Sequence, residues 1–172
     1  MPENVTVAVF DEDENVREAV RSLKEVNISD EYISVVGPAG KIKPLSEEVQ
    51  GFHTTSHRLR AGAKWGGWIG AIAGVIGGAA VFLVAPPAGA VVAVGTLASI
   101  IAGAIEGAVL GAGLGILATA LASMGIKEPE AKELEKRIAA GEFLVIVKGP
   151  AEVVTRADEV LRATNPLHVA AA

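Results

Sequence analysis

Few side chains in this chain are of a type and in a setting that suggest chemistry, and Glu106 is the clearest of them. It is the only ionisable residue between Trp65 and Ile126. An isolated carboxyl in an apolar helix is costly, and in membrane proteins it marks a path for protons, ions or polar ligands. The alternative is a structural glutamate that is protonated or hydrogen-bonded between helical hairpins. A third hypothesis makes Glu106 the buried acid or base of an enzyme.

Two histidines and an acidic run are weaker candidates. His53 and His57 are four residues apart and would share one face of a helix, but no third ligand stands at a metal-binding spacing nearby. We therefore predict no metal site. Residues 11–14 are all acidic, which is typical of a solvated helix start because carboxylates favour the positive end of the helix dipole. Asp11 and Glu14 are also spaced for a capping box.

The common catalytic motifs are missing from the sequence. It contains no G-x-G-x-x-G loop, no nucleophile elbow and no cysteine, so a thiol nucleophile, a thiolate metal site and a disulfide framework are all excluded. The net charge of −5 and the 4% aromatic content are also unlike a nucleic-acid-binding surface. We expect a non-enzymatic protein that uses no cofactor and binds no nucleic acid.

A periodic glycine pattern lies on either side of residues 79–102. Glycines at every fourth position form one stripe on a helix, where another backbone can approach closely. In water each such glycine costs about 1 kcal/mol relative to alanine, so nine in register indicate a packing role. The predicted helix-packing residues are Gly62, Gly66, Gly70, Gly74, Gly78, Gly103, Gly107, Gly111 and Gly115.

The glycine-rich centre is also long enough to enter a membrane. Residues 65–85 carry no charge and as a helix would extend roughly 31 Å, about the thickness of the hydrocarbon core. Pro86 and Pro87 end this tract, and a second apolar tract follows at 88–122, of which 88–98 is expected in the turn or in a re-entrant piece. Lys64, Trp65 and Trp68 have the residue types of a membrane interface.

Basic residues precede the first tract and follow the second, whereas the Pro-Pro turn between them is uncharged. This pattern predicts a hairpin in the inner membrane with both termini in the cytoplasm. The expected partners are the lipid bilayer and further copies of the chain. The alternative is a cytoplasmic homo-oligomer whose hairpins bundle into an apolar core or conduit for a lipid-like ligand.

Both ends of the chain alternate strand and helix patterns. Together they predict an α+β fold, a ferredoxin-like sandwich completed by residues 1–60 and 127–172, with residues 61–126 inserted as a glycine-zipper helical hairpin. Strands are predicted at 5–9, 32–36, 143–147 and 167–169, and helices at 14–26, 129–138 and 150–161.

The whole pattern resembles a family of bacterial general-stress or low-temperature-induced proteins, in which a ferredoxin-like frame is interrupted by a glycine-zipper hairpin. The resemblance rests on the opening strand and acidic helix start, on Ile33-Ser34-Val35-Val36-Gly37, on the zipper, and on the stretch from Gly125 through Pro129 and Gly141 to the strand 143–147. It implies a stress-inducible, membrane-associated protein without catalytic residues to carry over. We expect assembly through the zipper helices in support of membrane integrity.

Overall fold

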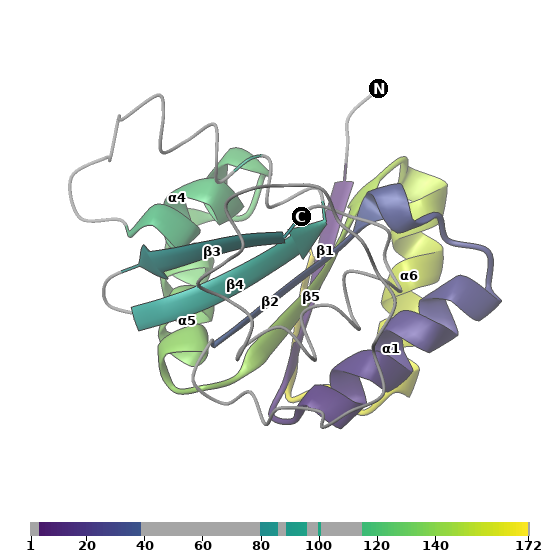
Figure 1. The fold of residues 1–172 in the computed structure, drawn as a ribbon. Helices are drawn as coiled ribbons and strands as arrows, with labels where there is room; N and C mark the ends of the chain where they lie inside the picture. The colour runs from purple at the N-terminus through teal and green to yellow at the C-terminus, as the bar shows by residue number, and fades with distance from the viewer. Residues whose placement is uncertain (1–3, 39–79, 86–88, 96–99, 101–114, 172) are drawn as a thin grey trace, which may run out of the picture.

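The computed structural model describes residues 4–38, 80–85, 89–95, 100 and 115–171, and they form an α+β domain (Figure 1). Its strands are β1 (Asn4–Phe10), β2 (Ile33–Pro38), β3 (Ala80–Ala85), β4 (Gly89–Gly95), β5 (Phe143–Gly149) and β6 (His168–Ala171). Its helices are α1 (Asp13–Glu25), the 3₁₀ turn η1 (Asp30–Tyr32), α4 (Ile116–Ser123), α5 (Glu128–Ala139) and α6 (Ala151–Ala163).

The six strands form one antiparallel sheet in the order β3-β4-β2-β5-β1-β6. β5 lies between β1 and β2, with Val7 opposite Ile146 and Val35 opposite Val145. The middle of the chain adds β3 and β4 beside β2, and the C-terminal β6 lies beside β1. Among the strands that the structure describes, the two edges of the sheet are therefore β3 and β6.

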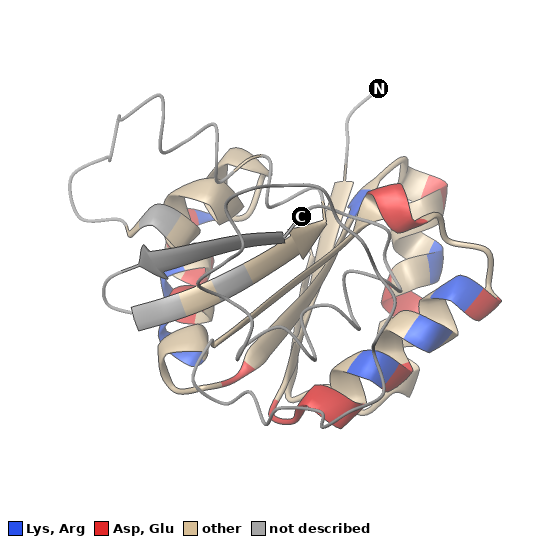
Figure 2. Cartoon of the chain, viewed as in Figure 1, with Lys and Arg blue, Asp and Glu red and all other residues tan. Residues whose placement is uncertain are grey.

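Helices cover both faces of the sheet (Figure 1). α1 and α6 pack on one face, against side chains such as Phe10 and Val145. α4 and α5 pack on the other, against side chains such as Val9 and Ile146. Because both faces are covered, the central strands are buried on both sides and are mostly apolar, as the fully buried run of β2 illustrates. Apart from Glu135 on α5, the charged residues of the described helices lie mainly on their outward sides (Figure 2).

The elements predicted for the two ends of the chain are confirmed. β1, β2, β5 and β6 occupy the predicted strand positions to within a few residues, and α1, α5 and α6 the predicted helices. One detail at the start of α1 differs. Glu12 is the N-cap and makes no side-chain capping bond, while Asp11 accepts a hydrogen bond from Asn15 Nδ2 at 3.1 Å. The predicted capping box is therefore wrong, although Asp13 does lie in the first turn and pairs with Arg17.

The middle of the chain requires a correction. The helix predicted over 65–85 does not continue to residue 85, because residues 80–85 form strand β3 and residues 89–95 form strand β4. Val81 lies opposite Ala93, and Leu83 opposite Val91. A short apolar run of β-branched and aromatic residues suits a strand as well as a helix. Here β3 pairs with β4, which in turn pairs with β2, and this pairing makes the run a strand.

Only the end of the second apolar tract is described as a helix. α4 covers residues 116–123, and Leu117 and Leu121 are fully buried against α5 and the sheet. In the described part of the chain, no helix combines the length and the apolar character that a membrane crossing requires. The apolar residues of α4 and β4 thus contribute to the core of the domain.

Candidate functional site

The most unusual polar group in the described structure is the Glu135 carboxyl on α5. Its residue is only 4% exposed. Glu135 lies on the same stripe of α5 as the core residues Ala131, Leu134 and Ile138, at the i+4 position from Ala131. The carboxyl accepts hydrogen bonds from the backbone N–H groups of Gly115, Leu117 and Ala118. Glu135 therefore caps the first turn of α4 from the neighbouring helix.

Capping from another helix satisfies N–H groups that have no partner within α4 itself. The negative charge also lies at the positive end of the helix dipole, where it is favourable. α4 has no side-chain cap of its own, because its N-cap residue is Gly115. Glu135 supplies what the local sequence of α4 lacks.

Gly115 makes this contact sterically feasible. A Cβ atom built on Gly115 would lie 2.1 Å from Glu135 Oε1 and 2.5 Å from Oε2. The φ of Gly115 is −73°, which any residue adopts, so the requirement is for space and not for a special backbone conformation. The sequence predicted Gly115 as a helix-packing glycine within a zipper. The structure places it just before α4, in extended backbone, against a carboxyl.

Burial raises the pKa of the Glu135 carboxyl, and the three backbone hydrogen bonds oppose that rise. Among the described residues, Glu135 Oε1 has no hydrogen-bond partner. A carboxyl in this setting holds its proton more tightly than an exposed glutamate does. The Glu135 carboxyl therefore links α4 to α5, and its protonation makes this link depend on pH.

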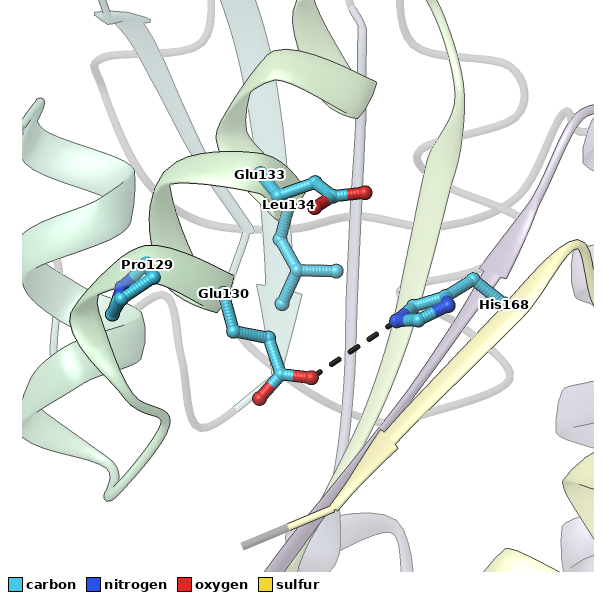
Figure 3. A pocket seen from close by; sticks show the side chains of 5 residues that line it. All are labelled: Pro129, Glu130, Glu133, Leu134 and His168. Atoms are coloured by element: carbon cyan, nitrogen blue, oxygen red, sulfur yellow. Dashed lines mark ion pairs between the residues drawn. The ribbon is translucent and has the colours of Figure 1, made fainter.

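A second feature is a small groove between α5 and the edge strand β6 (Figure 3). Its volume is about 270 Å³, and Pro129, Glu130, Glu133, Leu134 and His168 line it. Glu130 Oε1 lies 4.0 Å from His168 Nε2, at the limit of an ion pair with a protonated imidazole. Both side chains are more than 30% exposed. Glu133 is also engaged elsewhere, by Arg137 Nη2 at 3.4 Å.

A carboxylate beside an imidazole can orient a general base, but that role also needs a nucleophile or substrate proton within reach. The five residues lining the groove include no hydroxyl or thiol side chain. Within the described ranges there is also no group of three or more His, Cys, Asp or Glu residues arranged to hold a metal ion. We interpret the Glu130–His168 pair as a solvent-accessible tie between α5 and β6.

Most residues singled out from the sequence lie outside the described residues. These are Glu106, His53, His57, Lys64, Trp65, Trp68 and the zipper glycines Gly62, Gly66, Gly70, Gly74, Gly78, Gly103, Gly107 and Gly111. The structure therefore brings none of them into a described site. Sequence reasoning missed Glu135, although a signal was present: its position on the apolar stripe of α5 marks it as a buried carboxyl.

The fold is thus an α+β domain with helices on both faces of an antiparallel sheet. Residues 5–82, from β1 into β3, match the family model of the heat induced stress protein YflT domain. This match confirms the resemblance to a family of bacterial general stress proteins. Comparison with curated proteins gave no match, and neither did comparison with solved structures.

Proposed function

We propose that this chain is a non-enzymatic stress-response protein that works by assembling with further copies of itself through its apolar middle. The stress role is supported by the family match. The observation that carries assembly is the position of β3. This strand comes from the charge-free tract, and it forms an edge of the sheet instead of its centre. The described residues 80–85 of the tract therefore lie at an edge of the sheet, where the strand of a second molecule could pair with them.

The composition of the tract adds to this argument. Between Trp65 and Ile126, Glu106 is the only residue that carries a charge. Monomeric proteins rarely expose a contiguous apolar patch beyond a few hundred Å². The parts of the tract in β4 and α4 are buried in the domain core. Assembly would give any apolar side chains of the tract that the core does not bury a partner surface to pack against.

Membrane association is a second candidate, favoured by the aromatic and basic residues before the tract, Lys64, Trp65 and Trp68. Chain length supports self-assembly over crossing. Residues 96–114 connect β4 to α4, and both of these elements pack in the same core. A crossing takes about 20 helical residues in each direction, and this connection has 19 in total. Residues 65–79 would reach only about 22 Å even if fully helical.

Fractionation distinguishes these two candidates. Cells expressing the full chain are lysed, and their membranes are washed with high salt and then with carbonate. Before lysis, the intact cells are treated with an amine-reactive cross-linker, which should give a ladder of bands at multiples of the 17.5 kDa chain mass. Recovery of the ladder without detergent supports self-assembly. Retention until detergent is added supports insertion in the membrane. An uncross-linked monomer in the soluble fraction contradicts both.

A finer description of the fold is also proposed. Without β3 and β4, the sheet has the order β6-β1-β5-β2. In chain order, the first strand (β1) and the third (β5) then lie in the centre, and the second (β2) and the fourth (β6) lie at the edges. α1 and α6 follow the first and third of these strands and share one face. This is the arrangement of a ferredoxin-like frame. The double variant Val9→Cys, His168→Cys joins paired positions of β1 and β6 and should form a disulfide within one chain. Its absence would count against this frame.

A further inference from the structure

The two edges of the sheet differ in how they are protected. Edge strands expose unpaired backbone groups, and proteins protect them with short length, charged side chains, proline or a bulge. β6 is four residues long and includes His168, which faces Glu130. β3 is six residues long, reads Ala-Val-Phe-Leu-Val-Ala, and contains neither charge nor proline nor glycine. By its sequence, β3 is the edge without protection.

The pairing of β3 is one-sided in the described part of the chain. All six of its residues, from Ala80 to Ala85, pair with β4, in an unbroken register that ends at Ala85 opposite Gly89. No bulge interrupts this ladder, so the outer row of N–H and C=O groups forms a regular template for a further strand. A strand that fits should be extended, of similar length and apolar. The same segment of a second copy meets each of these requirements.

We propose that β3 pairs antiparallel with β3 of a second copy, which joins two six-stranded sheets into one continuous sheet. This inference rests on the proposed function, because it names the contact through which assembly begins. A symmetric dimer has a two-fold axis, and the same patch on both copies forms its interface. With the axis perpendicular to the sheet, the helix layers of one copy continue those of the other.

The symmetry restricts the register. A two-fold axis perpendicular to the sheet leaves each face of β3 on the same side of the joined sheet in both copies. Two residues that lie opposite each other must therefore both have even numbers or both have odd numbers. One residue of β3 therefore lies opposite its own copy. If the axis lies near the middle of β3, the residue that lies opposite its own copy is either Phe82 or Leu83. Opposite Cα atoms in antiparallel strands are about 4.5–5.5 Å apart, within the range of a disulfide. A residue next to the self-opposed one is displaced by about 7 Å along the strand from its own copy, which is too far for a disulfide.

A single-cysteine scan tests this geometry in the full chain, which has no cysteine of its own. Each residue from Ala80 to Ala85 is replaced in turn, and disulfide-linked dimer is measured on non-reducing gels under mild oxidation. The proposal predicts one strong position, Phe82→Cys or Leu83→Cys, with little dimer for Ala80→Cys and Ala85→Cys. Equal linking at all six positions would indicate parallel stacking or unspecific aggregation and would overturn the proposal, as would the absence of links.

A charge placed in the strand gives an independent test. Leu83→Lys should halve the mass of the assembled unit in light scattering, because it introduces a protecting charge into an apolar edge. Ala171→Lys, at an exposed position of the other edge strand, is the matched control and should leave the mass unchanged. Circular dichroism of both variants shows whether the fold is retained, and the cysteine scan decides the question if Leu83→Lys does not fold. Failure of the β3 contact and failure of assembly are separable. An unchanged mass for folded Leu83→Lys, without cross-links in β3, overturns this contact alone, whereas a monomeric unmodified chain overturns both.

Discussion

The carboxyl of Glu135 lies against the backbone of Gly115, so that a helix of the C-terminal part of the chain caps the helix that ends the apolar middle. α4 supplies no side-chain cap of its own, and α5 supplies one from outside. The contact explains how the end of the apolar middle is fixed to the domain. It also makes the stability of the domain depend on one buried carboxyl and on the space that one glycine leaves.

Replacement of Gly115 by alanine should be strongly destabilising. The new Cβ would lie 2.1 Å from Glu135 Oε1, so the carboxyl must move away from the N–H groups that it accepts. Overpacking together with the loss of buried hydrogen bonds is expected to cost about 3 kcal/mol of unfolding free energy, measured by urea denaturation.

Gly125→Ala is the matched control for this change. Gly125 has a φ of +104°, but a Cβ there would meet nothing within 4 Å. This substitution tests backbone strain without a steric clash, and its cost should be about 1–2 kcal/mol. If Gly115→Ala costs no more than Gly125→Ala, the close contact with Glu135 is not important for stability.

The raised pKa of Glu135 makes stability depend on pH. Above pH 4.5 the unfolded carboxyl loses its proton, whereas the folded one, with its pKa raised by burial, retains it to higher pH. The folded state therefore binds more protons in this window, and the contribution of Glu135 to stability falls as pH rises from 4.5 through the folded pKa. Below pH 4.5 this contribution is fully present.

Glu135→Gln removes the titration and keeps an acceptor oxygen for α4. The difference in unfolding free energy between the unmodified chain and this variant should shift with pH in that window, in favour of the variant at the higher pH. Urea denaturation at several pH values measures it. Parallel stability curves for the two proteins would show that burial does not perturb this carboxyl.

A second polar contact, buried on the Thr6 side and partly exposed at Asp158, connects β1 to α6. Thr6 is fully buried, and its Oγ1 donates to Asp158 Oδ1 at 3.0 Å. Asp158 is also paired with Arg162 Nε at 2.7 Å, so it keeps a partner when the threonine hydroxyl is removed. Thr6→Val, which has nearly the same shape, should cost about 1 kcal/mol.

A double-mutant cycle with Asp158→Asn separates this contact from other effects of the two substitutions. A coupling free energy of about 1 kcal/mol is expected from the cycle. Additive effects would mean that Thr6 and Asp158 do not interact across the β1–α6 interface.

The ends of the chain could be predicted from the sequence because their patterns are unambiguous. Alternating valines at 5, 7 and 9 fit only a strand, and the helix predicted over 129–138 has proline in its first turn and a glycine after its end. The middle was harder, because glycine spacing and uniform apolarity agree with a helix, and only pairing with β2 through β4 distinguishes a strand at 80–85. Glu135 was not predicted because α5 carries many other charged residues, whereas Glu106 stands alone in an apolar sequence. The burial of Glu135 depends on the packing of α4 against α5, and this packing could not be predicted from the sequence alone.

The most direct test of the central claim is the molar mass of the full chain in solution, measured by size-exclusion chromatography with light scattering over a range of concentrations. Assembly through the apolar middle predicts a defined species of at least twice the 17.5 kDa chain mass, which Leu83→Lys reduces by half. A monomer of 17.5 kDa at every concentration would contradict the account.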